Sequence, residues 1–509
     1  MLAKVFSYSI LGMETYRIEI EVDVSSGLPT VVIVGLPDAA VRESKDRVKS
    51  AIRNSHFEYP VSRITVNLAP ADVKKEGPSF DLPIALGILA ATSQIKEDFL
   101  KEYIILGELA LDGSVRAIKG ALPIALSMRD CNIKKLILPE ENASEAGIVE
   151  DIEVYPVKTL VQAIAFINGD SFLVRHRVDL KDIFKNASNH DIDFSDVKGQ
   201  EHAKRALEIS AAGSHNLLML GPPGSGKSML AKRLLTILPD ITFEEALETT
   251  KIYSTAGLLS SKEPIITNRP FRNSHHTASD ISIVGGGTIP KPGEVSLAHN
   301  GVLFFDELPE FHRNTLEALR QPLEDGYVTI SRISKSLRFP SRFLFIATMN
   351  PCPCGFFGSS KECHCNPYQI QKYREKISGP LLDRIDIHIE VPALKYRELT
   401  GTSDGESSKD IKGRVEKART FQLQRFEDSG IYFNSQMSHK MIRKFCPLND
   451  ETKNLLKTAI DEFGISARAY DKILKVARTI ADLSCSESIR EEDISEAIQY
   501  RTLDRNLLF

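Results

Sequence analysis

Residues Asn216 to Leu230 read NLLMLGPPGSGKSML. Four apolar residues, Leu217 to Leu220, lead into a turn rich in glycine and proline, and a helical spacing of apolar residues begins at Met229. This order predicts a buried strand, a turn and a helix, as in an α/β fold. The backbone N–H groups of such a turn can surround a phosphate, and the helix N-terminus adds positive potential. The stretch therefore predicts a site for ATP or GTP, with a purely structural glycine and proline turn as the alternative.

The turn matches the pattern G-x-x-x-x-G-K-[ST]. Its members are Gly221, Pro222, Pro223, Gly224, Ser225, Gly226, Lys227 and Ser228. The glycines leave room for backbone N–H groups to approach the phosphates. We expect Lys227 to reach the β- and γ-phosphates and Ser228 to ligate Mg²⁺.

The composition limits the class of protein. A chain of 509 residues suggests about three domains. Its 42% hydrophobic and 26% charged residues are typical of a globular protein in water, and its net charge of −4 gives no overall sign of affinity for nucleic acid. The longest apolar run, Leu82 to Ala91, is too short to cross a bilayer, and the first residues lack the pattern of a secretory signal. We therefore expect a cytoplasmic protein that does not enter a membrane.

The first 175 residues alternate between strand and helix patterns. Strands are expected at Tyr16 to Val22, Thr30 to Val34 and Ile64 to Leu68, and a helix of mixed charge at Val41 to Arg53. This region contains no phosphate-loop motif. It is predicted to be an α/β domain with its own core.

Part of this region resembles the proteolytic domain of Lon proteases. Lys75 to Ser79 read KEGPS, and an apolar helix and the sequence GELALDGSVRAIKGALPIAL follow. In the Lon family a serine of this turn is activated by a lysine, and the resemblance places that lysine at or near Leu122, which cannot accept a proton. Lys119 belongs to a different helical face. We therefore expect a Lon-like α/β fold without peptidase activity, in which Ser79 caps the following helix.

Residues 176–192 are predicted to be a linker, because they are polar and include the stretch Asn-Ala-Ser-Asn-His. The segment that follows, DFSDVKGQEHAKRALEIS, resembles the approach to the phosphate loop in AAA+ ATPases. That resemblance implies that Val197 and Gly199 contact the nucleotide base. It also implies an ATPase core over residues 193–398 and a C-terminal helical lid over residues 410–509.

Two further strands supply polar residues at their ends. GVLFFDE ends in Asp306 and Glu307, and FLFIATMN ends in Asn350. Asp306 is expected to hold Mg²⁺ through water and Glu307 to polarise the attacking water. The alternative is a purely structural role for this pair of acids, as an acidic cap of the helix at Arg313 to Leu323. In the AAA+ pattern, Asn350 has the sensor 1 role and holds the attacking water.

The AAA+ resemblance assigns roles to two arginines. Arg384, in LLDRID, occupies the place of the arginine finger, which acts on the nucleotide of a neighbouring subunit and so implies a ring. Arg468, at the start of a lid helix, matches the sensor 2 arginine, which contacts the γ-phosphate in trans. A local ion pair is the alternative for each of them.

Two insertions narrow the family. Residues 270–300 begin with P-F-R-N and resemble the helix-2 insertion of magnesium-chelatase-type ATPases. The sequence DGYVTISRISKSLRFPSRF then alternates like a hairpin. The resemblance implies a presensor hairpin, which in such ATPases typically points into the pore of the ring. The hairpin sequence carries Arg332, Lys335, Arg338 and Arg342. We expect these cations to bind DNA phosphates, with a solvated basic face as the alternative.

Across essentially its whole length the chain resembles the magnesium-chelatase-related AAA+ family of the YifB/ComM type. The resemblance implies a homo-hexamer that uses ATP and Mg²⁺ to act on single-stranded or branched DNA, most specifically as a branch-migration helicase in recombination and natural transformation. The alternative is a chelatase-like or MoxR-like ATPase that remodels a protein partner.

Four of the seven cysteines form a C-x-C-x₈-C-x-C array. They are Cys352, Cys354, Cys363 and Cys365. Two C-x-C arms joined by a glycine turn can present four thiolates tetrahedrally to zinc. Free thiols or a disulfide are the alternatives. A zinc ion closed by four sulfurs would brace the loop and would have no open position for catalysis.

Overall fold

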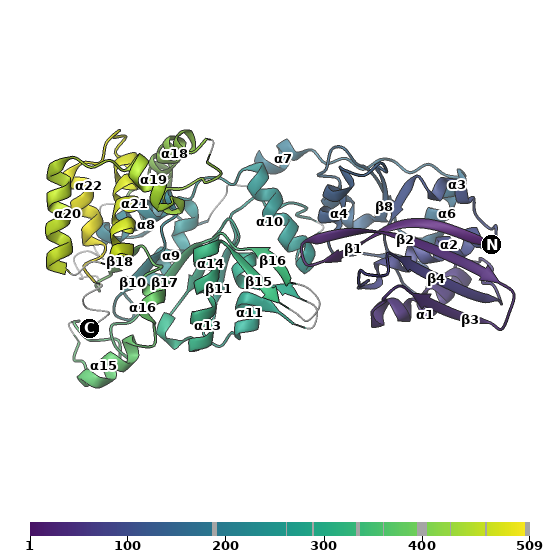
Figure 1. Ribbon diagram of the computed structural model, residues 1–509, viewed down its shortest axis with the longest axis horizontal. Coiled ribbons are helices and arrows are strands. Elements are labelled where there is room, and N and C mark those ends of the chain that lie inside the picture. Colours follow the sequence, from purple (N-terminus) through teal and green to yellow (C-terminus); the bar gives the residue numbers. More distant parts are fainter. Residues whose placement is uncertain are drawn as a thin grey trace. The chain divides into compact units, whose positions relative to one another are not determined.

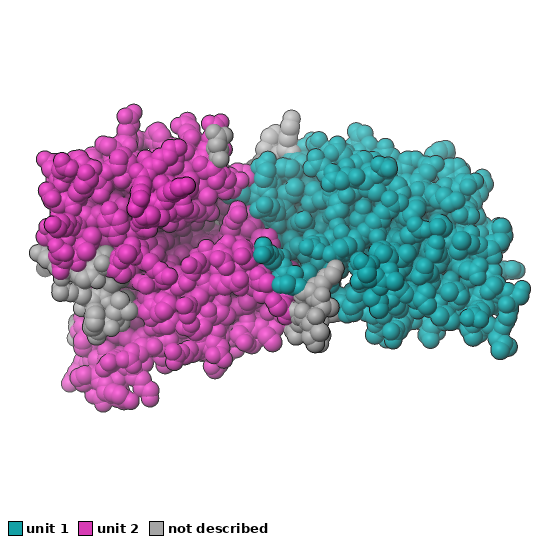
Figure 2. All heavy atoms as spheres, in the orientation of Figure 1, with its two compact units in different colours: residues 1–187, 243–267, 333–338 teal, residues 188–242, 268–332, 339–509 magenta. Residues whose placement is uncertain are grey.

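The computed structural model describes residues 1–185, 191–260, 262–287, 290–331, 336–359, 361–393, 405–427, 429–463 and 466–503. The chain forms two compact units (Figure 2). Unit 1 comprises residues 1–187, 243–267 and 333–338, and unit 2 comprises residues 188–242, 268–332 and 339–509. Each unit is therefore built from segments that are separated in the sequence.

Unit 1 is organised around a seven-stranded sheet with the order β3-β4-β2-β1-β5-β8-β9 (Figure 1). Its strands are β1 (Leu2–Leu11), β2 (Glu14–Ser25), β3 (Thr30–Val34), β4 (Arg63–Ala69), β5 (Tyr103–Ile105), β8 (Lys135–Pro139) and β9 (Glu153–Val157). Its helices include α1 (Ala39–Asn54), α2 (Asp81–Ala91), α3 (Glu97–Leu100), α4 (Ala121–Met128), α5 (Ala143–Ala146), α6 (Leu160–Asn168), α7 (Leu180–Lys185) and α10 (Phe243–Ala256). The short strands β6 (Glu108–Leu109) and β7 (Val115–Arg116) pair with each other.

The secondary structure expected for the first part of unit 1 is confirmed. The predicted strands lie within β2, β3 and β4, and the predicted helix lies within α1. The apolar run Leu82 to Ala91 forms most of α2, in which every residue is buried. Among the described residues, no helix combines the length and apolar composition needed to cross a bilayer.

The prediction for Ser79 was wrong. Ser79 lies inside a 3-10 turn, Pro78–Phe80, that runs directly into α2. The N-cap position of α2 is Phe80, and in the described structure no side chain caps this helix. The backbone N–H of Leu82 instead donates to the carbonyl of Gly107 at 3.0 Å, which satisfies a group that a cap would otherwise serve.

Unit 2 contains a five-stranded sheet with the order β11-β14-β17-β10-β18. The strands are β11 (Phe271–Ser274), β14 (Val302–Phe305), β17 (Leu344–Met349), β10 (Leu217–Leu220) and β18 (Ile387–Glu390). Neighbouring strands are parallel, with Leu220 of β10 opposite Met349 of β17 and Phe305 of β14 opposite Ala347. The loops that follow β10, β14 and β17 therefore leave the same edge of the sheet.

Helices complete unit 2. The helices that precede its C-terminal region are α8 (Glu201–Gly213), α9 (Lys227–Arg233), α11 (Asp280–Val284), α12 (Glu294–Leu297), α13 (Arg313–Ala318), α14 (Arg320–Asp325), α15 (Pro367–Arg374) and α16 (Gly379–Leu382). Small strands form two further pairs, β12 (Gly285–Gly286) with β13 (Lys291–Pro292) and β15 (Tyr327–Ser331) with β16 (Ser336–Pro340), of which residues 336–338 are assigned to unit 1. The C-terminal helices are α18 (Ser408–Arg425), α19 (His439–Phe445), α20 (Asp450–Phe463), α21 (Ala467–Leu483) and α22 (Glu491–Gln499).

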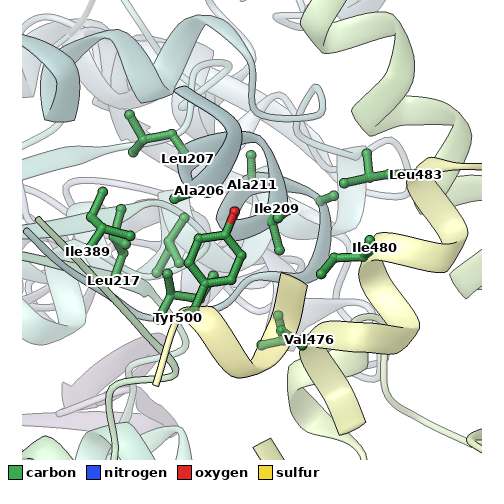
Figure 3. Close-up of a cluster of buried hydrophobic side chains, with 14 of the residues drawn as sticks. Ala206, Leu207, Ile209, Ala211, Leu217, Ile389, Val476, Ile480, Leu483 and Tyr500 are labelled. Carbon is green, nitrogen blue, oxygen red and sulfur yellow. The ribbon is translucent and has the colours of Figure 1, made fainter. Parts of the chain in front are cut away.

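The C-terminal helices share one hydrophobic core with the sheet. Val476, Ile480 and Leu483 of α21 lie in the same buried cluster as Ile209 of α8, and Tyr500 lies between these helices (Figure 3). The cluster continues into β10 and β18. This arrangement confirms the expected α/β fold class, with a parallel sheet that carries the phosphate loop and a C-terminal helical region.

Candidate functional site

The phosphate loop joins β10 to α9 at the carboxyl edge of the sheet in unit 2. A Cβ atom at Gly221 would lie 2.2 Å from the carbonyl oxygen of Val391, so this position has no room for a side chain. Gly224 and Gly226 have φ values of +78° and +88°, which favour glycine. The Ser225 hydroxyl is buried and has no hydrogen-bond partner among the described residues. A turn with glycines at positive φ and a buried, unsatisfied hydroxyl fits a phosphate group.

Lys227 begins α9 and is buried against the loop, with 8% of its surface exposed. Its amino group donates to the carbonyls of Gly221 and Pro222 at 2.7 and 2.9 Å, and to Asn350 Oδ1 at 3.3 Å. Burial lowers the pKa of this amino group, while the nearby charges of Asp306 and Glu307 act to raise it. The carbonyls thus accept the hydrogen bonds that a bound anion would receive from the lysine.

Asp306 and Glu307 follow β14 and join the phosphate loop through hydroxyl groups. Ser228 Oγ donates to one carboxylate oxygen of Asp306 at 2.9 Å, and Thr348 Oγ1 donates to the other. The same Thr348 hydroxyl accepts the backbone N–H of Glu307 at 3.0 Å. Glu307 has a φ of +56°, a value that is uncommon for a residue with a side chain. The structure therefore brings Ser228 and both acids together, with Thr348 between them.

The alternative of an acidic helix cap is not supported. Helix α13 begins after His312, which occupies the N-cap position, and in the described part of the chain no side chain caps it. The Asp306 carboxylate is instead engaged by Ser228 and Thr348.

The segment before α8 contacts the phosphate loop. The contact is made by Gln200, which the sequence patterns did not single out. Gln200 Nε2 donates to the carbonyl of Ser225 at 2.6 Å. Of the two residues expected at the base, Val197 is fully buried in the core of unit 2, and Gly199 has a φ of +62°. Gln200 immediately follows Gly199, and this position next to a residue expected at the base is the sequence feature that could have identified it.

Thr348 was also missed, because it lies in the apolar run FLFIATMN. A threonine in such a strand is usually a β-branched core residue. Only its contacts with Asp306 and Glu307 reveal the role of its hydroxyl.

The two candidate arginines lie elsewhere in unit 2. Arg384 pairs with Glu324 of α14 and donates to the carbonyl of Pro380 at 2.7 Å. Asn216, which precedes β10, donates to the backbone carbonyl of Arg384 at 3.0 Å. Arg468 is exposed in the first turn of α21. The local ion pair considered for Arg384 is therefore present in the single chain.

Two of the four candidate DNA-binding cations can be placed. Arg338 is exposed on β16, and Arg342 is exposed just before β17. Arg332 and Lys335 lie outside the described residues.

The four cysteines of the array converge after β17. The Sγ atoms of Cys352, Cys354 and Cys363 are 3.4 to 3.7 Å apart, and that of Cys365 completes a group whose sulfurs all lie within 4.8 Å of one another. Four sulfurs at about 2.3 Å from a tetrahedral ion would be about 3.8 Å apart, whereas a disulfide needs about 2.05 Å. A hydrogen bond from the backbone of Phe356 lowers the pKa of the Cys354 thiol to about 6, whereas desolvation and contacts with Cys352 and Cys354 raise the pKa of the Cys363 and Cys365 thiols. The chemistry and spacing of this donor set fit a bound metal.

Three family models match the chain. The model described as "Magnesium chelatase, subunit ChlI" matches residues 193–399. The model "Subunit ChlI of Mg-chelatase" matches residues 20–142, and "Magnesium chelatase, subunit ChlI C-terminal" matches residues 405–501.

Two relatives align over essentially the whole chain, and a third aligns over part of it. The competence protein ComM of Haemophilus influenzae is 46% identical over 511 residues, which cover 99% of this chain and 98% of ComM. The uncharacterized protein YifB of Escherichia coli is 44% identical over 508 residues, which cover 100% of this chain and 98% of YifB. The magnesium-chelatase 38 kDa subunit of Rhodobacter capsulatus is 29% identical over 224 residues, which cover 40% of this chain and 60% of that subunit.

Proposed function

Since the chain belongs to the magnesium-chelatase-related AAA+ family of the YifB/ComM type, we propose that it is an ATP-driven ring motor that acts on DNA in the cytoplasm. The observation that carries the ATPase part is the hydrogen-bonded chain from Ser228 through Asp306 and Thr348 to Glu307, next to Lys227. Phosphoryl transfer depends on positioning and charge neutralisation, which this group of residues is suited to provide.

Each residue of the group has a role in the proposed reaction. The backbone of the phosphate loop and Lys227 would bind the β- and γ-phosphates, while Ser228 and Asp306 would hold Mg²⁺. A bound Mg²⁺ supplies neutralisation of the charge that develops on the phosphate oxygens. Glu307 would polarise the attacking water by accepting a hydrogen bond from it, and Asn350 would orient that water. Gly199 would line the base, beside the Gln200 bridge to Ser225, and the fully buried Val197 would support this segment from the core of unit 2.

A ring is part of the proposal. Arg384 would act as an arginine finger and Arg468 as the sensor 2 residue, each on the nucleotide of a neighbouring copy in a homo-hexamer. Arg384 would then exchange its pairing with Glu324 for the neighbour's γ-phosphate. This exchange offers a way for assembly and hydrolysis to depend on each other.

DNA is the proposed substrate of the motor. The relative from Haemophilus influenzae is named a competence protein, which supports a role on DNA in transformation. Arg332, Lys335, Arg338 and Arg342 would bind phosphates of single-stranded or branched DNA in the pore, and the motor would drive branch migration. Similarity to a magnesium-chelatase subunit supports the second candidate, a chelatase-like or MoxR-like ATPase that remodels a protein partner.

We propose Zn²⁺ as the ion of the four-cysteine group. Cys352, Cys354, Cys363 and Cys365 supply the donor set of structural zinc sites, and their sulfur separations fit a tetrahedron.

The test is ATP hydrolysis by the purified protein with and without single-stranded and four-way-junction DNA, at several salt concentrations. We expect hydrolysis to rise with DNA and the rise to weaken as salt increases, because phosphate contacts release counterions. Lys227→Ala is the control and should not hydrolyse ATP in any condition. A wild-type protein that hydrolyses ATP but neither binds DNA nor responds to it would support the protein-remodelling alternative. A wild-type protein without hydrolysis would refute the ATPase itself.

A further inference from the structure

The loop that carries the four cysteines rests on the phosphate loop. A Cβ atom at Gly355 would lie 2.6 Å from both Cγ and Cδ of Pro223, and 3.9 Å from Cγ of Asn350. Pro223 is part of the turn between β10 and α9, and its ring is rigid. The cysteine loop and the proposed nucleotide site therefore touch directly, with no flexible side chain between them.

The cysteine loop is also attached at both of its ends. It leaves β17 at Asn350, and the helix that follows it, α15, returns to this point. Burial raises the pKa of the Tyr373 hydroxyl, and the nearby backbone of Asn350 acts to lower it. Arg374 Nε donates to the carbonyl of Pro351 at 3.4 Å. The Arg374 guanidinium also lies over the Phe357 ring at 5.6 Å. Asn350 thus marks the place where the loop begins and where α15 closes it.

The first cysteine organises the part of the loop that meets Pro223. Cys352 is fully buried, and the backbone N–H of Phe357 donates to its sulfur at 3.3 Å. The N–H of Gly355 donates to the carbonyl of Cys352 at 3.0 Å. These bonds fold residues 352–357 back onto Cys352. Because thiols are weak hydrogen-bond donors and acceptors, a metal bound by all four sulfurs would be the main force that holds this segment.

We propose that the metal-bound cysteine loop is a positioning element for ATP hydrolysis, which holds Pro223 of the phosphate loop and Asn350 in their working places. The inference rests on the proposed function and goes beyond the bracing of the loop itself. Metal occupancy would then control the motor, since loss of the ion would release Gly355 from Pro223. A misplacement of about 1 Å in an active site can lower a rate about 100-fold.

Two glycines of the same loop provide a matched test. Gly355 and Gly358 have φ values of +83° and +74°, so alanine is strained to a similar degree at both positions. A Cβ at Gly358 would meet no atom within 4 Å, whereas one at Gly355 would collide with Pro223. Gly355→Ala should therefore lower kcat for ATP by about 10- to 100-fold. Gly358→Ala should hydrolyse ATP within about twofold of the wild-type rate, and both variants should keep the wild-type metal content.

A second variant distinguishes a collision with Pro223 from general disruption of the loop. Pro223→Ala removes the ring atoms that the new Cβ would meet, so the double variant Gly355→Ala, Pro223→Ala should have a higher kcat than Gly355→Ala alone. Equal rates for Gly355→Ala and Gly358→Ala would overturn the proposal, as would a double variant no faster than Gly355→Ala. These outcomes are distinct from a wild-type protein that hydrolyses no ATP, which would refute the proposed function instead.

A readout independent of hydrolysis follows from linkage. If the metal-bound loop stabilises the nucleotide-bound form of the phosphate loop, bound nucleotide must in turn stabilise the metal-bound loop. MgADP should therefore slow transfer of the metal to a coloured chelator several-fold in the wild-type protein. Lys227→Ala should weaken this protection, and Gly355→Ala should reduce it more than Gly358→Ala does. Metal release that is the same with and without MgADP would refute the coupling.

Discussion

Replacement of Thr348 by valine should separate nucleotide binding from hydrolysis. Thr348 is fully buried, and its hydroxyl donates to Asp306 while it accepts the backbone N–H of Glu307. Valine has nearly the same shape but no hydroxyl, so Thr348→Val removes both bonds without opening a cavity. It leaves the two proposed catalytic acids less firmly oriented.

The magnitude follows from the two bonds. A hydrogen bond to a charged group contributes about 2 kcal/mol and a neutral one about 1 kcal/mol. If both were fully expressed in the transition state, the loss of about 3 kcal/mol would correspond to a decrease of about 150-fold in kcat. Ser228 still holds the other oxygen of Asp306 at 2.9 Å, so part of the orientation should survive. We therefore expect kcat to fall about 10- to 100-fold.

Steady-state hydrolysis over a range of ATP concentrations, together with equilibrium binding of a fluorescent nucleotide, would measure the effect. Binding should change little, because Lys227 and the loop backbone remain intact. Thr348→Ser is the control: it keeps the hydroxyl and loses one methyl group, which costs about 0.8 kcal/mol of apolar burial. A Thr348→Val protein that hydrolyses ATP within about twofold of the Thr348→Ser rate would refute this reasoning.

Three further predictions concern the metal, the ring and DNA. Metal analysis should find about one zinc per chain, and Cys352→Ser should lose it because three thiolates no longer close the tetrahedron; an unchelated wild-type protein without metal would contradict the site. Arg384→Ala should bind ATP but hydrolyse it about 1,000-fold more slowly, and mixing it with Lys227→Ala subunits should restore part of the activity; no recovery would argue against action in trans. Arg342→Gln should weaken single-stranded DNA binding and reduce its salt slope by about 0.7 per lost phosphate contact, measured by fluorescence anisotropy, whereas Arg42→Gln, an exposed change on α1, should do neither.

The phosphate loop and the acids could be predicted because each lies in a continuous motif. Glycines, Lys227 and Ser228 follow one apolar strand, and Asp306 and Asn350 end two others. Parallel strands place their carboxyl ends at one edge, so the hydrogen bond between Ser228 and Asp306 is what such a sheet leads one to expect.

Contacts between distant side chains could not be predicted in the same way. The bridging role of Thr348 and the contact of Gly355 with Pro223 depend on atomic positions in segments that are far apart in the chain. Ser79 is an example of the opposite error, because a residue favoured at caps lies in a turn whose N–H groups are served by the backbone. The preference of a residue type for a cap or a strand describes that residue alone, whereas these hydrogen bonds and contacts depend on two residues together.

Unit 1 is built from separate segments of the chain, and this affects how the protein can be divided into fragments. Helix α10 belongs to this unit and packs against α4, and Ser254 on α10 donates to Glu145, a carboxyl whose pKa is raised by burial. A gene truncated after residue 187 would encode the sheet without this helix, and Glu145 would lose a partner. Conversely, a single backbone cleavage after residue 187 would not release the N-terminal fragment, since residues 243–267 would still anchor it. Genetic boundaries drawn along the sequence would therefore yield an incomplete fragment, and limited proteolysis would yield a nicked but undivided protein.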